Sequence, residues 1–299
     1  MNRFVLLATL AAVLGASALS PVQAQESATL KKIRDSASIT LGHRESSIPF
    51  SYYDDRQQVI GYSHELMLKA VDDIKAELKL GKLDVRLMPV TSANRITLVQ
   101  NGTVDIECGS TTNNLERQKQ VAFSTSIFVI GTRLMTKKDS GIRDFADLAG
   151  KNVVTTAGTT SERLLRKMNE DKKMGMNVIS AKDHGESFLT LETGRAVAFM
   201  MDDALLYGEM AKAKKASDWV VVGTPQSREA YGCMLRKDDP GFKKVVDAAL
   251  VRAMTSGEAE KIYAKWFMNP IPPKGLNLNM PLSEEMKVLY KSPNDKAFD

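Results

Sequence analysis

The sequence predicts an α/β protein built of two lobes. Short apolar strand-like segments alternate with helix-like segments along nearly the whole chain, which is typical of βαβ units with largely parallel sheets. The chain has 299 residues, 43% hydrophobic and 26% charged, enough for one large or two medium-sized domains with hydrophobic cores. A last strand and two helices follow a second series of alternating segments, so we expect the chain to return to its first lobe.

The first 24 residues have the three-part layout of a secretory signal peptide. Arg3 supplies a positive charge, residues 4–19 form an apolar run, and Val22, Gln23 and Ala24 form a cleavage site with small residues. The run is too short and too rich in small residues for a membrane span. We therefore expect cleavage near Gln25 and a soluble, exported product.

Periodicity places the elements of the first part. Leu66, Ala70, Ile74 and Leu78 recur at four-residue steps and predict a helix over 62–78. A short helix over 92–101 ends at Gly102. Strands or extended segments are expected at 38–41, 49–53, 83–90, 104–108, 121–123 and 128–135.

A second unit begins after Lys137, and the chain then returns. Strands are expected at 152–156, 177–180, 196–201 and 219–222, and helices at 159–168, at 184–192 and from 202–203 onward. The returning segment comprises a strand at 231–236 and helices at 240–255 and 258–267. Pro270, Pro272 and Pro273 should end the regular structure and leave a polar tail to Asp299.

Composition argues against several classes of function. The net charge of +5 comes from interleaved acidic and basic residues, whereas nucleic-acid-binding proteins concentrate cations on one face. Three His and two Cys argue against zinc fingers, Fe–S clusters and His-built metal centres. Nucleotide-binding glycine motifs, a nucleophile elbow and a zinc-protease motif are all missing. We expect no metal, no cofactor, no nucleic acid and no enzymatic activity.

Two pairs of residues leave alternatives open at this point. Asp202 and Asp203 follow an apolar strand and suit either acid–base chemistry or a helix N-cap. Cys108 and Cys233 are an even number in an exported chain, so they form either a disulfide or two buried thiols that never meet.

Several segments, in chain order, carry a resemblance. They are Gly-His-Arg-Glu-Ser-Ser from 42, Pro-Phe-Ser-Tyr from 49, Gly-Tyr-Ser-His-Glu-Leu from 61, Asn-Arg at 94, Asn-Gly-Thr-Val-Asp from 101, Glu-Cys-Gly-Ser-Thr-Thr-Asn-Asn-Leu-Glu-Arg from 107, Val-Ala-Phe-Ser from 121, Ala-Phe-Met-Met-Asp-Asp from 198 and Tyr-Gly-Cys-Met-Leu-Arg-Lys-Asp-Asp from 231. Together the chain resembles the periplasmic amino-acid-binding proteins of ATP-binding-cassette importers (solute-binding proteins of family 3), in particular those for glutamate and aspartate.

The resemblance implies a two-lobe periplasmic binding protein fold of type II, with a hinge and an interlobe cleft. Lobe one would comprise residues 25–131 and 226–299, and lobe two residues 132–225. It places Cys108 and Cys233 in the same lobe, which favours a disulfide. The implied protein is a monomeric periplasmic receptor that delivers L-glutamate or L-aspartate to an inner-membrane permease.

The expected site follows from the charges of such a ligand, because an amino acid buried with an unpaired carboxylate or ammonium costs several kcal/mol. The resemblance assigns the α-carboxylate to Arg117 through a bidentate fork, and the α-ammonium to Asp202, with Asp203 as the alternative. Arg44 and Arg95 would face the side-chain carboxylate and reject neutral ligands. The expected ligand-binding set is Arg44, Ser92, Arg95, Ser110, Thr112, Arg117, Thr160 (or Thr159), His184 and Asp202.

Two other classes of function compete with the receptor. Some exported relatives resemble these binding proteins yet act as cyclohexadienyl-type dehydratases, which turnover of a cyclohexadienyl acid would reveal. A ligand-sensing domain is disfavoured because no membrane span or signalling domain follows. Glutamate and aspartate differ by one methylene, worth only ~1–3 kcal/mol in a pocket, so the sequence leaves their ranking open.

Overall fold

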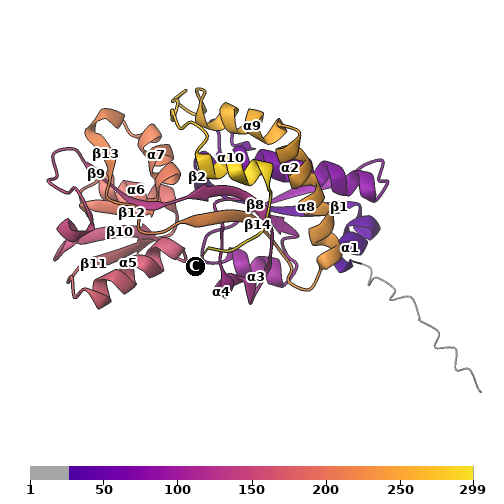
Figure 1. The fold of residues 1–299 in the computed structure, drawn as a ribbon, viewed down its shortest axis with the longest axis horizontal. Coiled ribbons are helices and arrows are strands. Elements are labelled where there is room, and N and C mark those ends of the chain that lie inside the picture. Colours follow the sequence, from indigo (N-terminus) through magenta and orange to yellow (C-terminus); the bar gives the residue numbers. More distant parts are fainter. Residues whose placement is uncertain (1–26, 299) are drawn as a thin grey trace, which may run out of the picture.

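The computed structural model describes residues 27–298 and contains two separate main sheets, each covered by helices (Figure 1). The expected signal peptide at 1–24 lies outside the described residues. Within residues 27–298, no helix is long and apolar enough to cross a membrane. The two sheets lie side by side along the long axis of the molecule.

The first sheet has the strand order β5-β1-β6-β14-β7, and β8 pairs with β14. Its strands are β1 (Ser38–His43), β5 (Asp84–Pro89), β6 (Ile106–Glu107), β7 (Thr112–Asn113), β8 (Ala122–Ile130) and β14 (Glu229–Leu235). The β5, β1 and β6 strands are parallel, whereas β14 runs antiparallel to its neighbours because it belongs to the returning chain. A small antiparallel sheet, β2 (Ser46–Ser47), β3 (Ser51–Tyr53) and β4 (Val59–Ile60), lies beside it.

Helices from both ends of the chain cover this sheet. They are α1 (Ala28–Ser36), α2 (Tyr62–Glu77), α3 (Arg95–Gln100), α4 (Leu115–Gln118), α8 (Pro240–Thr255), α9 (Glu258–Phe267) and α10 (Glu284–Lys291). The second sheet has the order β11-β10-β12-β9-β13. It is built from β9 (Thr132–Lys137), β10 (Asn152–Thr156), β11 (Asn177–Ala181), β12 (Ala198–Asp202) and β13 (Trp219–Val222), with helices α5 (Thr160–Asp171), α6 (His184–Glu192) and α7 (Asp203–Lys212).

The chain passes from one sheet to the other twice, at Gly131 and over residues 223–228. These segments lie against each other: a Cβ added at Gly131 would come within 3.1 Å of the Ser227 carbonyl oxygen, and the Gln226 N–H donates to the Thr132 carbonyl at 3.0 Å. Residues 128–135 are extended as expected, but the segment divides at Gly131 into strands of two different sheets, next to the lobe boundary that the resemblance implies. Local pattern alone does not show where an extended chain changes partners.

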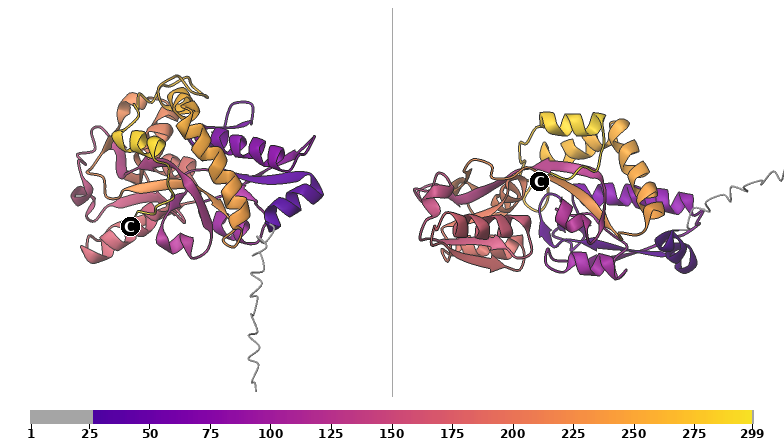
Figure 2. Two further views of the ribbon diagram at one scale, coloured as in Figure 1. Left: turned by 45° about the vertical axis from the view of Figure 1, so that its right-hand side comes forward. Right: turned by 60° about the horizontal axis from the view of Figure 1, so that its bottom comes forward.

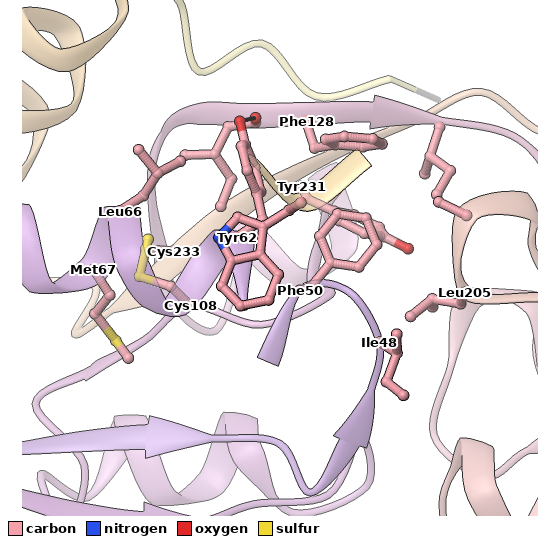
Figure 3. Packing of buried hydrophobic residues seen from close by; sticks show 14 of the residues in the cluster. Ile48, Phe50, Tyr62, Leu66, Met67, Cys108, Phe128, Leu205, Tyr231 and Cys233 are labelled. Carbon is pink, nitrogen blue, oxygen red and sulfur yellow. Dashed lines mark hydrogen bonds between the residues drawn. A yellow bond between two sulfur atoms is a disulfide. The ribbon is translucent and has the colours of Figure 1, made fainter. Parts of the chain in front are cut away.

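An aromatic cluster that includes Phe50, Phe128 and Tyr231 holds the segment between β2 and β3 in place (Figure 3). The Phe50 ring lies edge-on to Phe128 at a centroid distance of 4.9 Å and to Tyr231 at 5.2 Å. The next residue, Ser51, accepts a hydrogen bond from the Arg44 N–H at 2.9 Å. Packing of Phe50 therefore helps to hold the backbone that carries Arg44.

The expected disulfide between Cys108 and Cys233 is present, with a Cα–Cα distance of 4.3 Å. It joins the end of β6 to the middle of β14, beside the pairing of Glu107 with Met234. The covalent link holds the segment that follows β6, which contains Ser110, against the returning strand.

The polar tail expected after Pro270 is wrong over 284–291, which form α10. Ser283 caps this helix by accepting a hydrogen bond from the Met286 N–H at 3.2 Å. The apolar face of Met286, Leu289 and Tyr290 is buried against lobe-one elements, and the Tyr290 hydroxyl lies 2.8 Å from that of Tyr62. Figure 2 shows that α8 and α10 cover only the first sheet.

Candidate functional site

The sequence-predicted site residues lie where strands of the two sheets end or helices begin. Arg44 directly follows β1, Ser92 and Arg95 lie after β5, Ser110 and Thr112 follow β6, Arg117 lies in α4, Thr160 and His184 begin α5 and α6, and Asp202 ends β12. The carboxyl ends of strands are where ligands bind in open α/β sheets.

Arg44 and Arg95 form one cationic end of this region, and both are almost completely buried. Arg44 Nη1 lies 3.4 Å from Ser110 Oγ, and Arg95 Nη1 donates to the Ser110 carbonyl at 3.0 Å. Arg95 also donates to Thr111 Oγ1. The segment after β6 therefore holds both guanidinium groups, which lie close enough for Arg95 to lower the pKa of Arg44.

Arg117 bridges the two halves of the molecule. Its Nη1 donates to the Thr112 carbonyl at 2.9 Å, and its Nη2 donates to the Gly158 carbonyl at 3.3 Å. Asn114 fixes the start of the helix by accepting from the Arg117 N–H at 2.9 Å. Burial, followed by the charge of Arg95, lowers the pKa of Arg117 to about 10.

Asp202 forms the anionic end, and the structure separates it from Asp203. Thr132 Oγ1 donates to Asp202 Oδ1 at 2.9 Å, Ser161 Oγ donates to the same oxygen at 3.3 Å, and the Tyr231 hydroxyl donates to Oδ2. Burial, and then the nearby charge of Glu229, raise the pKa of Asp202 to about 7. The Asp202 carboxyl thus accepts hydrogen bonds from Thr132, Ser161 and Tyr231. It has no neighbouring cation in the described chain to stabilise its charged form.

The buried charges of this region are incompletely paired. Among residues 27–298, Arg44 and Arg117 have no carboxylate oxygen within 4.0 Å, and Asp202 has no cationic nitrogen within that distance; Arg95 has Glu107 at 3.9 Å. Burial is the main cause that lowers the pKa of Arg44 to about 10. Such an arrangement can stabilise a guest that carries both an ammonium and carboxylates.

His184 and Ser92 contribute buried atoms that lack a protein partner. His184 Nδ1 lies 2.8 Å from Thr156 Oγ1, whereas its Nε2 has no partner within the described chain. Ser92 Oγ and Arg95 Nε are likewise buried and unpartnered there. Burial and the charges of Arg44 and Arg95 hold the pKa of His184 well below its usual range, so the ring is neutral at pH 7.

The two candidate threonines of α5 have different tasks. Thr159 is the N-cap: its hydroxyl accepts from the Glu162 N–H at 3.0 Å and donates to the Thr156 carbonyl at 2.7 Å. The Thr160 hydroxyl instead donates to Glu229 Oε2 at 2.8 Å.

Four further residues around the site were not singled out from the sequence: Glu107, Thr132, Glu229 and Tyr231. Tyr231 stood in a motif quoted for the resemblance, but nothing in a single sequence shows that its hydroxyl meets Asp202. Thr132 and Glu229 lie beside the two crossing segments, so their proximity is a tertiary feature. The signal that could have found them is their position next to the expected lobe boundaries.

The two halves are packed together in a closed arrangement. The Ser46 hydroxyl lies 3.3 Å from Asp183 Oδ1 and accepts from the Gly185 N–H at 3.3 Å. Ile48 and Leu205 lie next to each other (Figure 3). A Cβ added at Gly208 of α7 would stand 2.2 Å from the Ile48 carbonyl oxygen, so this contact requires glycine.

Fold and site together define a two-lobe α/β binding protein. Residues 39–269 match the model of the bacterial extracellular solute-binding proteins, family 3, and the chain belongs to this family. The type II periplasmic binding protein fold expected from the sequence is confirmed.

Named relatives and solved structures agree with this assignment. The chain is 68% identical over 288 residues to the L-glutamate/L-aspartate-binding protein of Pseudomonas aeruginosa, covering 96% of this chain and 95% of that protein. It is 64% identical over 271 residues to the glutamate/aspartate import solute-binding protein of Escherichia coli, covering 91% and 90%. An ancestral arginine-binding protein bound to arginine is similar in structure, with a TM-score of 0.70, 28% identity and coverage of 77% and 98%.

Gly208→Ala tests whether solute binding requires the closed packing. The added methyl group collides with Ile48 only when the lobes are together, while alanine favours the helix itself by about 1 kcal/mol. We expect solute affinity to fall at least tenfold in calorimetric titration, because closure around the solute must then displace Ile48. Gly185→Ala is the matched control, since its Cβ meets its nearest atoms at 3.4 Å; equal losses in both variants would contradict the prediction.

Asp202→Asn tests the charge deficit at the anionic end. Because the folded-state pKa of Asp202 is raised from 3.8 to about 7, the folded protein holds a proton that the unfolded chain releases across this range. Stability of the closed, solute-free protein should therefore fall as pH rises from 4 to 7. Burial also raises the pKa of Glu209 to about 7, which makes stability fall over the same pH range. Asp202→Asn should therefore reduce the dependence of the unfolding free energy on pH only in part. Urea unfolding at a series of pH values measures it, and an unchanged slope would contradict the assignment.

Proposed function

We propose that this chain is a receptor that binds L-glutamate and L-aspartate between its lobes and delivers them to an importer. The observation that carries the proposal is the set of buried, unpaired charges: Arg44 and Arg117 without carboxylates, and Asp202 without a cation. An acidic amino acid brings one ammonium and two carboxylates, which complement this set. The names of the relatives from Pseudomonas aeruginosa and Escherichia coli support the same ligands.

The charged residues of the predicted set receive separate tasks in this proposal. Arg117 binds the α-carboxylate, and Asp202 binds the α-ammonium together with its support from Thr132 and Tyr231. Arg44 and Arg95 bind the side-chain carboxylate. The unpartnered Ser92 Oγ and His184 Nε2 lie in the same charged region and are further candidates for contacts with the ligand.

The proposed lobes are residues 25–131 with 226–299, and residues 132–225, in agreement with the change of sheet at Gly131 and over 223–228. Ligand stabilises the closed form because each lobe contributes a charge that the other cannot pair. The closed protein is proposed to work as a monomer in the periplasm, after removal of residues 1–24, and to dock on the permease of an ATP-binding-cassette importer.

A calorimetric titration tests this function. Protein stripped of ligand by unfolding and refolding is titrated with glutamate, aspartate, glutamine, asparagine, arginine and histidine. We expect tight binding of the two acids alone. Tight binding of a neutral or basic amino acid would contradict the proposed ligands, and turnover of a cyclohexadienyl acid without amino-acid binding would favour the dehydratase alternative instead.

Arginine variants test the separate tasks. Arg117→Ala should abolish binding of every amino acid, because the α-carboxylate is common to all. Arg44→Ala and Arg95→Ala should weaken glutamate and aspartate at least a hundredfold but change residual glutamine binding far less, since only the acids have a charged side chain. Arg86→Ala, on the exposed β5 strand, is the control. Equal losses for acids and glutamine in the Arg44 and Arg95 variants would overturn the assignment.

A further inference from the structure

Glu229 joins the two lobes through hydrogen bonds to a side chain of each. It is the first residue of β14, immediately after the second crossing segment, and is 5% exposed. Its Oε2 accepts from Thr112 Oγ1 of the first sheet and from Thr160 Oγ1, 2.8 Å away, at the start of α5. This one oxygen therefore accepts a hydrogen bond from a side chain of each half of the molecule.

The other carboxylate oxygen is held by the crossing segments. Glu229 Oε1 accepts from Ser227 Oγ at 3.2 Å, and Ser227 Oγ lies 2.6 Å from Thr132 Oγ1. Thr132 in turn donates to Asp202. The position of the Glu229 carboxylate is thus tied both to the hinge and to the anionic end of the site.

Glu229 also lies at the border between solvent and the buried arginines. A groove of about 550 Å³ is lined by Thr112, Thr160 and Glu229, and by Leu115 and Arg163 at its sides. Thr112 reaches the groove with its side chain and accepts from Arg117 Nη1 with its carbonyl. The hydrogen bonds to Glu229 therefore close the cleft on the side of this groove.

We propose that Glu229 is a positioning residue that ties the two lobes together at this mouth of the cleft and slows release of the bound amino acid. The proposal rests on the proposed function, since it concerns release of that ligand. Thr112 and Thr160 donate hydrogen bonds to Glu229, and these hydrogen bonds stabilise the closed form. Because the tie forms only when the lobes meet, it acts on dissociation and leaves the encounter of ligand with the open form unchanged.

Two substitutions separate the hydrogen bonds from the charge. Glu229→Ala removes the acceptor that both threonine hydroxyls share and leaves them only the 3.4 Å contact with each other. Glu229→Gln keeps an oxygen for them and an amide that can donate to Ser227, while it removes the charge. Glu116→Ala is the matched control, because Glu116 also bridges the lobes, through an ion pair with Arg163 in which both side chains are at least half exposed, and such pairs contribute little.

The experiment measures release of radiolabelled glutamate from full-length mature protein into excess unlabelled glutamate, with the dissociation constant from calorimetry. We expect Glu229→Ala to release glutamate at least tenfold faster than the wild type, with an association rate within twofold of the wild type. Glu229→Gln should stay within about threefold in release, and Glu116→Ala within twofold.

Several results would overturn the inference. Release from Glu229→Ala within twofold of the wild type would show that the tie is not formed, and equal release from the Ala and Gln variants would show that charge acts instead of the hydrogen bonds. A parallel fall in association rate and melting temperature would indicate a general structural role. A wild type that retains no amino acid of the titration panel overturns the proposed function itself, and the inference falls with it.

Discussion

Burial of guanidinium groups without matching carboxylates is the constraint on which the arrangement of the lobes depends. Arg44 and Arg117 have no carboxylate oxygen within 4.0 Å in the described chain, Arg95 has only Glu107 at 3.9 Å, and all three are at most 5% exposed. Burial, followed by the charge of Arg95, lowers the pKa of both Arg44 and Arg117. Removal of a charge from water costs several kcal/mol unless a partner compensates. Closure of the cleft is therefore unfavourable by itself at this point and becomes favourable when a guest supplies the missing anions. This links occupancy of the site to the shape of the protein.

The architecture places these charges without making them part of either core. The apolar core around Phe50, Phe128 and Tyr231 and the Cys108–Cys233 bond hold the elements around the first sheet together without help from the contacts with the second sheet. The interlobe contacts are of another kind: close packing at Gly208 and polar contacts at Ser46 and Glu229. Packing of this sort is formed and lost as a unit, which suits a two-state hinge motion.

Chain order and residue chemistry were sufficient to predict much of this, and the limits have physical reasons. The strand before Arg44 and the helices after Thr159 and Asp183 follow from local periodicity, and the resemblance to a known family marked the residues of the candidate site. The division of 128–135 at Gly131 depends on which sheet each half joins, so the local pattern does not show it and only the lobe boundary implied by the resemblance marked it. The α10 helix was missed because its three apolar positions are diluted by charged residues and follow three prolines. Glu229 was missed because its partners, Thr112 and Thr160, lie 117 and 69 residues away in the chain.

Selectivity in such a site rests on charge more than on size. In the proposed assignment, a neutral side chain would leave Arg44 without an anion in a buried position, and an unpaired buried charge is far more costly than a poorly filled volume. Glutamate and aspartate would satisfy the same charges and differ by one methylene, so we propose that the distance between Arg117 and the pair formed by Arg44 and Arg95 discriminates between them. All three arginines are held by the segment after β6, through Ser110 and Thr112. In the proposed assignment, the backbone that the Cys108–Cys233 bond anchors would therefore set the length of ligand that fits.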